Sequence, residues 1–216
     1  MWVKICGTTN LEDAQAAVDA GADALGFVFA ESPRRIEPAV AGEIVQSLPE
    51  RIEKVGVFVN ETAEHIREVV EEAGLTAVQL HGYETLDVPA KLKAEPGSPR
   101  DLQVIPAYPM RRLLEGEVLV NFWTFDRVLF DTAVEGKRGG TGQTWDWEWG
   151  KAMIETVRDR VRIVIAGGLT PANVANAIRT LRPWGVDVVS GVERELGKKD
   201  HEKVRAFVKT AKSADL

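Results

Sequence analysis

Cysteine, histidine and excess basic charge are scarce in this sequence, and each shortage excludes a class of protein. The 216 residues contain one cysteine and three histidines. One cysteine cannot form an internal disulfide, and so few cysteines and histidines exclude the familiar zinc patterns. The formal net charge of −6 offers no basic surface to nucleic acid or to anionic membrane. We therefore expect no metal and no nucleic acid, and a small molecule as the partner.

Long apolar runs are absent as well. No stretch approaches the roughly 20 apolar residues that span a bilayer, and the segment that begins Met1–Lys4 lacks the apolar core of a signal peptide. We expect a cytoplasmic protein without membrane contact. Apolar residues make up 44% and charged residues 28% of the chain, as in ordinary globular proteins, and the length fits one domain over residues 1–216.

Short apolar, β-rich runs alternate with segments of helical period along the chain. This alternation is typical of repeated βα units with a parallel sheet. Eight units in 216 residues predict a single-domain (β/α)8 barrel, or TIM barrel, with an open doubly wound sheet as the alternative. The expected strands cover residues 2–6, 24–29, 54–59, 77–80, 103–107, 128–131, 162–166 and 186–190.

Helix starts and ends are readable at several points. Asn10, Thr62 and Asp200 are predicted N-caps, and Thr170 is predicted to cap a helix that begins at the proline after it. The fifth unit is the weakest, with room for a short helix over residues 110–114 only. Three similar segments, which begin at residues 21, 74 and 185, place a glycine before a buried strand. We expect the same left-handed helix end at all three.

Two residues at predicted strand ends could carry chemistry. The loops after the strands form the rim that carries the active site of such barrels. Cys6 ends the first strand and Asp131 ends the sixth. A lone cysteine there is more often a small hydrophobe than a catalyst, whereas a buried carboxylate needs a partner or a function. As a pair, they could approach a substrate from two sides, one accepting and one donating a proton.

Glycine-rich loops follow the last three predicted strands. They contain Gly139 and Gly140, Gly167 and Gly168, and Ser190 and Gly191. Glycine lets the backbone approach an anion closely, and barrels often bind phosphate between the last two of these loops. Any one loop alone would predict only a turn. Three on one rim predict a phosphorylated substrate.

Two further rim positions are candidates for binding. Arg34 and Arg35 follow Ser32 and Pro33 on the loop after the second strand, and a guanidinium there suits a carboxylate or a phosphate on the ligand. A solvated surface pair is the alternative. His81 follows the fourth strand and is either a general base or a hydrogen-bonded structural residue.

These motifs, in this order, resemble the phosphoribosylanthranilate isomerase family of tryptophan biosynthesis. The resemblance extends from residue 3 to about residue 208, and the ordered combination is far more specific than any single motif. The matching segments are residues 4–7, 26–29 with 32–34, 55–60, 78–82, 130–132, 139–142, 166–169, 189–193 and 197–200. Thr8 and Arg35 depart from the usual pattern of the family, and residues 95–125 match it poorly.

The resemblance implies a cofactor-free Amadori rearrangement of N-(5-phosphoribosyl)anthranilate to 1-(2-carboxyphenylamino)-1-deoxyribulose 5-phosphate. Asp131 matches the general acid that protonates the ribose ring oxygen, and Cys6 matches the base that takes the proton from C2. Arg34, rather than Arg35, matches the arginine that holds the anthranilate carboxylate, and the glycine loops match the phosphate site. A free thiol is only a few per cent ionised at neutral pH, so we predict that nearby cationic or dipolar groups lower the pKa of Cys6.

Two other functions fit part of the pattern. One is another phosphosugar barrel enzyme of histidine or tryptophan biosynthesis, although indole-glycerol-phosphate synthase would need lysines at its strand ends, and Lys4 lies inside the strand. The other is a catalytically silent barrel that binds a phosphorylated ligand, which would need neither Cys6 nor Asp131. The sequence leaves open the oligomeric state and the acceptance of a second aminoaldose.

Overall fold

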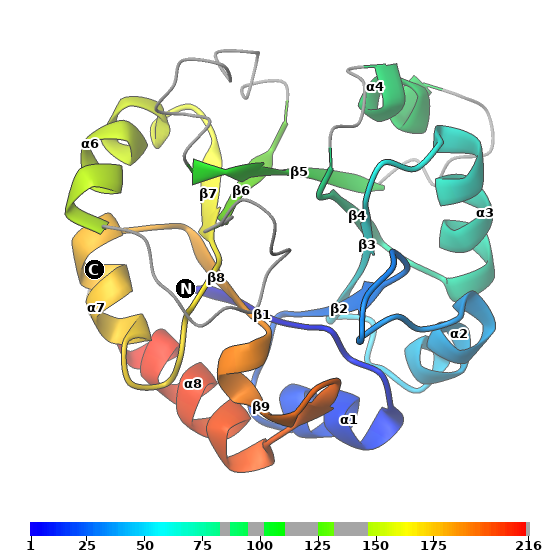
Figure 1. Cartoon of the computed structure of the whole chain (residues 1–216), viewed down its shortest axis with the longest axis horizontal. Coiled ribbons are helices and arrows are strands. Elements are labelled where there is room, and N and C mark those ends of the chain that lie inside the picture. Colours follow the sequence, from blue (N-terminus) through cyan, green and yellow to red (C-terminus); the bar gives the residue numbers. More distant parts are fainter. Residues whose placement is uncertain (83–86, 95–101, 111–124, 132–146, 215–216) are drawn as a thin grey trace.

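The strands close into one barrel with helices around it (Figure 1). The structure is a computed structural model that describes residues 1–82, 87–94, 102–110, 125–131 and 147–214. Neighbouring strands are parallel and follow chain order, and the last pairs with the first. The strands are β1 (Trp2–Cys6), β2 (Ala24–Val28), β3 (Glu53–Phe58), β4 (Ala77–Leu80), β5 (Gln103–Pro109), β6 (Arg127–Asp131), β7 (Arg162–Ile165) and β8 (Gly185–Val188).

The predicted (β/α)8 barrel is therefore confirmed. An open sheet is excluded because β8 pairs with β1 along four residues, which leaves no free edge there. The observed bounds of β1 and β4 are the predicted ones, and those of the other strands differ by one or two residues. The predicted short helix at 110–114 falls, except for Met110, outside the described residues.

Helices cover the outside of the barrel (Figure 1). Each helix forms where apolar residues recur at helical spacing, because this spacing places them on one face that can be buried. In the third helix, that face consists of the buried residues Ile66, Val69, Val70 and Ala73. None of the helices in the described segments has the length and apolar character of a membrane span. The helices are α1 (Leu11–Asp19), α2 (Pro38–Gln46), α3 (Ala63–Ala73), α4 (Asp87–Ala94), α6 (Trp147–Val157), α7 (Val174–Leu181) and α8 (His201–Ser213).

Three of the four predicted helix caps are confirmed. The side chain of Asn10 accepts the N–H of Asp13 at 2.8 Å, and that of Thr62 accepts the N–H of His65 at 3.2 Å. Asp200 accepts two N–H groups at the start of α8. Each cap satisfies N–H groups that have no partner within the helix, which fixes where the helix begins.

The fourth predicted cap is wrong, because α7 begins at Val174 and not at Pro171. The side chain of Asn173 accepts the N–H of Thr170 at 2.7 Å, and the carbonyl of Thr170 accepts the N–H of Val174 at 3.1 Å. Residues 170–173 therefore form a separate turn before the helix. The Thr170 hydroxyl does not cap α7.

The three similar glycine segments are not equivalent. Gly21 and Gly74 have φ of 92° and 66°, so the predicted left-handed helix ends are confirmed there. Gly185 is different, because it lies in β8 and Arg182 takes the left-handed conformation at the end of α7. A Cβ atom on Gly185 would come within 2.8 Å of the Trp2 indole. Close packing, rather than a turn, requires this glycine.

Two apolar layers surround the strands. The larger one lies between strands and helices, and the smaller one fills the barrel. Trp2 and Trp184 pack against the inner layer and stack on each other with ring centroids 5.3 Å apart. At the N-terminal ends of the strands, the guanidinium of Arg127 lies over both indoles and pairs with Glu53. The inner layer consists of Ala24, Val55, Ala77, Ile105, Ala107, Leu129, Val164 and Ala166.

A short irregular segment between β8 and α8 was not predicted. It contains the 3-10 helix η2 (Ser190–Val192) and the antiparallel pair β9 (Glu193–Glu195) and β10 (Lys198–Lys199). Its turn contacts the loop after β1, where the Thr9 hydroxyl donates to the carbonyl of Gly197 at 2.6 Å. In Figure 1 this segment lies between α1 and α8. It brings charged side chains against the end of β1.

Candidate active site

Alternation along the strands places the candidate residues inside the barrel mouth. Side chains two residues apart share a face of a strand, so Lys4 and Cys6 of β1 point inward together. Gln79 of β4 and His81 directly after it do the same, as does Asp131 at the end of β6. These strands lie on different sides of the closed barrel (Figure 1). The predicted opposition of Cys6 and Asp131 across the mouth is consistent with this order.

The Cys6 thiol is buried, with 4% of the residue exposed. Gly26 on β2 leaves room for it, since a Cβ atom there would lie 2.5 Å from Sγ. Burial raises the pKa of Cys6, an effect that the nearby charge of Lys4 opposes and that of Asp187 reinforces. The prediction of a lowered pKa is therefore wrong for the free chain. Loss of hydration outweighs the cations because the thiolate would be almost fully enclosed.

Lys4 is fully buried beneath the thiol. Its Nζ donates to Asp187 Oδ1 at 3.0 Å and to Gln79 Oε1 at 2.9 Å. Burial by itself lowers the pKa of Lys4, but the negative charges of Asp187 and Cys6 reverse this, and the net effect is a raised pKa. Lys4 is thus an ammonium at neutral pH. Sequence reasoning treated it as a strand residue, although its spacing from Cys6 already placed both on one face.

Asp131 and His81 lie together, as two of the predicted site residues. The distance from His81 Nε2 to Asp131 Oδ2 is 3.4 Å. The other oxygen, Oδ1, is buried and has no hydrogen-bond partner among the described residues. A buried carboxyl oxygen without a partner is costly in a structural role. Among the described residues, a structural role alone therefore does not account for this carboxylate.

Arg34 is held inside the rim, whereas Arg35 lies at the surface beside Glu37. Arg34 Nε and Nη2 donate to the two carboxylate oxygens of Glu193 at 2.8 and 2.7 Å. These bonds raise the pKa of Arg34, against the opposing effect of burial. Gly7 gives the side chain space, since a Cβ atom there would lie 2.8 Å from Arg34 Cδ. A guanidinium has five N–H groups, so an edge formed by Nη1 and Nη2 is left for a second carboxylate.

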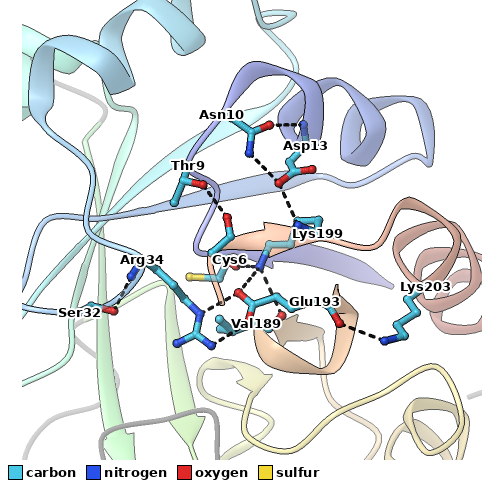
Figure 2. A network of polar contacts seen from close by, with 11 residues as sticks. Cys6, Thr9, Asn10, Asp13, Ser32, Arg34, Val189, Glu193, Lys199 and Lys203 are labelled. Atoms are coloured by element: carbon cyan, nitrogen blue, oxygen red, sulfur yellow. Dashed lines mark hydrogen bonds and ion pairs between the residues drawn. The ribbon is translucent and has the colours of Figure 1, made fainter. Parts of the chain in front are cut away.

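A second buried lysine connects this arginine to β1 (Figure 2). Lys199 Nζ donates to the carbonyls of Cys6 at 2.6 Å and Val189 at 3.3 Å, and to Glu193 Oε1 at 3.2 Å. Its backbone N–H donates to Asp13 at the start of α1. Lys199 thus ties the ends of β1 and β8 to the carboxylate that holds Arg34. Sequence reasoning quoted the motif around it but assigned it no role.

Two of the three predicted phosphate loops lie side by side. Gly167 and Gly168, after β7, have φ of 91° and 63°, a conformation that favours glycine. After β8, a Cβ atom on Gly191 would lie 1.8 Å from the carbonyl oxygen of Leu169, so the two loops touch at a position that only glycine fits. Ser190 begins η2 next to it. Gly139 and Gly140 lie outside the described residues.

The described residues contain no group of three or more histidine, cysteine, aspartate or glutamate side chains arranged to hold a metal ion. The polar groups instead converge on the carboxyl ends of the barrel strands, where barrels of this kind act on their substrates. Fold and site together define an α/β-barrel enzyme that acts on a small molecule.

The N-(5'-phosphoribosyl)anthranilate (PRA) isomerase family matches residues 3–210. The chain belongs to this family, and it is an aldose–ketose isomerase of tryptophan biosynthesis. An N-(5'-phosphoribosyl)anthranilate isomerase of Bacillus cereus is 44% identical to it, over 98% of this chain and 98% of that protein. Membership in this family favours the isomerase over the two alternatives from the sequence, which were another phosphosugar barrel enzyme and a catalytically silent ligand-binding barrel.

Solved structures of the same family resemble this chain over nearly its whole length. The crystal structure of phosphoribosyl anthranilate isomerase from Thermotoga maritima matches with a TM-score of 0.84 and 42% identity, over 98% of each chain. A phosphoribosyl anthranilate isomerase in complex with reduced 1-(o-carboxyphenylamino)-1-deoxyribulose 5-phosphate matches with a TM-score of 0.80 and 42% identity, over 98% of each chain. The 3-hexulose-6-phosphate synthase of Salmonella typhimurium, 16% identical with a TM-score of 0.66, shares the fold alone.

Proposed function

We propose that Asp131 and Cys6 are the acid and the base of the isomerisation of PRA to 1-(2-carboxyphenylamino)-1-deoxyribulose 5-phosphate. The observation that carries the proposal is the unpartnered, buried Oδ1 of Asp131 at one strand end, with the Cys6 thiol at the end of a strand that is not its neighbour. Two groups so placed can act on opposite sides of one sugar. A substrate analogue in a 42% identical relative supports the choice of ligand.

The reaction then takes place in three steps. Asp131 gives its proton to the ribose ring oxygen as the bond from C1 to that oxygen breaks, and the anthranilate nitrogen forms a double bond to C1. Cys6, as thiolate, takes the proton from C2, and the electrons move into a C1–C2 double bond while the nitrogen is neutralised. The resulting enolamine gains a proton at C1 and loses one from the C2 hydroxyl to give the ketone.

The remaining groups bind the ends of the substrate. We assign the anthranilate carboxylate to the Nη1–Nη2 edge of Arg34, because Glu193 already occupies the Nε edge. We assign the phosphate to the touching loops at Gly167–Gly168 and Ser190–Gly191, together with Gly139–Gly140. Because the one cysteine is a buried free thiol, a reducing, cytoplasmic setting fits the protein.

Turnover of freshly prepared substrate, followed by loss of its anthranilate fluorescence, tests the acid and the base. We expect Asp131→Asn and Cys6→Ala each to lower kcat by about 10²- to 10⁴-fold, the range for a general acid or base. Asp126→Asn is the matched control, because it makes the same change at the exposed opposite end of β6, and it should leave kcat unchanged. Full turnover in either site variant would refute the assignment.

A further inference from the structure

Gln79 is a buried amide whose two ends are both engaged. It lies in β4, and only 2% of the residue is exposed. Its Oε1 accepts from Lys4 Nζ at 2.9 Å, and its Nε2 lies 2.9 Å from His81 Nδ1. The acid assigned above lies on the far side of His81, with Asp131 Oδ2 at 3.4 Å from Nε2. Lys4, Gln79, His81 and Asp131 thus form a continuous polar chain across the barrel mouth.

The direction of this chain follows from which atoms donate. A lysine ammonium has three donors and no acceptor. The end of the Gln79 amide that faces Lys4 must therefore be its oxygen, and the end that faces His81 must be its NH2 group. Because that NH2 group only donates, His81 Nδ1 must accept and carry a lone pair. The raised pKa of Lys4 supports the charged state on which this assignment depends.

His81 is consequently neutral, with its proton on Nε2. Nε2 lies 3.4 Å from Asp131 Oδ2, so this oxygen, and not Oδ1, faces the protonated nitrogen. Oδ1 is left without a partner in the described residues. A charged imidazolium in the same place would favour the carboxylate form and oppose a general acid.

We propose that Gln79 is a positioning residue that holds His81 as the neutral Nε2–H tautomer and so leaves the transferable proton of Asp131 on Oδ1. The inference deepens the proposed function and rests on Asp131 being the acid. A purely structural role for Gln79 would be to fill the barrel and satisfy Lys4. The two roles are separable, since only the first depends on which nitrogen of His81 carries the proton.

Gln79→Glu separates them, because a glutamate has the same shape but accepts at both ends. It keeps a partner for Lys4, while its second oxygen now draws an additional proton to His81 Nδ1, which converts the imidazole to an imidazolium. The charged groups that face His81 and Gln79 in the described residues are Asp131 on β6, Lys4 on β1 and, through Lys4, Asp187 on β8. Among these, Asp131 lies next to the imidazole and would be favoured as a carboxylate.

Nitrogen NMR of the three histidines reads the tautomer directly, with the His81 signals assigned by their loss in His81→Asn. We expect a lone pair on Nδ1 and a proton on Nε2 in the wild type, and a protonated Nδ1 in Gln79→Glu. We expect Gln79→Glu to lower kcat roughly 10- to 100-fold, less than the loss of the acid itself. Gln46→Glu, on the exposed end of α2, should change neither signal nor rate.

The possible failures are distinguishable. A proton on Nδ1 in the wild type overturns the inference whatever the kinetics. If Asp131→Asn is inactive while Gln79→Glu keeps the rate and pH profile of the wild type, Gln79 is structural and only the inference fails. If Asp131→Asn retains full turnover, the proposed function fails, and with it the role assigned to Gln79. Circular dichroism of each variant checks that the barrel is folded.

Discussion

Two lysines are buried on either side of Cys6, and they differ in how they are paired. Lys4 has the Asp187 carboxylate at 3.0 Å as an ion-pair partner within the barrel. Lys199 shares the Glu193 carboxylate with Arg34 and otherwise contacts backbone carbonyls (Figure 2). Both ammonium groups are shielded from solvent. The difference between them therefore lies in their partners and not in their depth.

Their pKa values shift in opposite directions. Burial lowers the pKa of each lysine, but Asp187 and the Cys6 thiolate more than offset this for Lys4, whose pKa is raised. For Lys199, burial prevails, because Glu193 opposes it while the positive charge of Arg34 adds to it. Lys4 places a positive charge beside the thiol, whereas Lys199 holds the backbone carbonyl of Cys6 by a hydrogen bond. Lys4 therefore acts on the charge state of the Cys6 thiol, and Lys199 acts on the position of Cys6.

Removing Lys4 should have the largest effect on stability. Lys4→Met leaves the Asp187 carboxylate buried without a cation, which should cost about 3–5 kcal/mol of unfolding free energy in urea. Replacing both members, as Lys4→Met with Asp187→Leu, should recover much of this loss, since the uncompensated charge is gone. Lys198→Met removes an exposed ammonium as a control and should leave the urea midpoint unchanged.

Removing Lys199 should cost less. In Lys199→Met, Glu193 keeps both of its bonds from Arg34, so no charge is left unpaired. The lost charge-assisted hydrogen bonds should lower the free energy of unfolding by about 1.5–3 kcal/mol, measured in the same urea experiment. A larger loss of stability in Lys199→Met than in Lys4→Met would contradict the account, in which Lys199 is the less costly residue to remove because Glu193 still has Arg34 as a partner.

The pH-dependent part of the stability that comes from the shared Glu193 carboxylate should be the smallest of the three effects. Burial alone would raise the pKa of Glu193, but Arg34 and Lys199 hold it below its ordinary value. Its contribution to stability is therefore present above that ordinary value and lost as the pH falls through the lowered one. Glu193→Gln should flatten the decline in stability on acidification below about pH 5, whereas exposed Glu43→Gln should not. An unchanged slope would contradict the pairing.

Local pattern was sufficient to predict the strands, three helix caps and the residues that end strands. Cys6, Asp131 and Arg34 were identifiable because each stands at a strand end or on a rim loop. The Thr170 cap was wrong because a side chain three residues later captures its N–H. Lys4 pairs with Asp187 across 183 positions of sequence, and Lys199 meets the Cys6 carbonyl across 193. Only the closed barrel brings such groups together, so spacing along the chain could not reveal their pairing.

The ionisation of Cys6 is the most direct test, because the only cysteine gives the only thiolate signal. Thiolate absorbance can be titrated in the ultraviolet with Cys6→Ser as the baseline, alongside kcat/KM over the same pH range. The pKa of Cys6 should lie above the ordinary thiol value because the thiol is buried, and if Cys6 is the base, kcat/KM should show a limb with the same midpoint. A kcat/KM that stays constant through the titration of the thiol would contradict this role, and a thiol that ionises in or below its ordinary range would contradict the effect assigned to its burial.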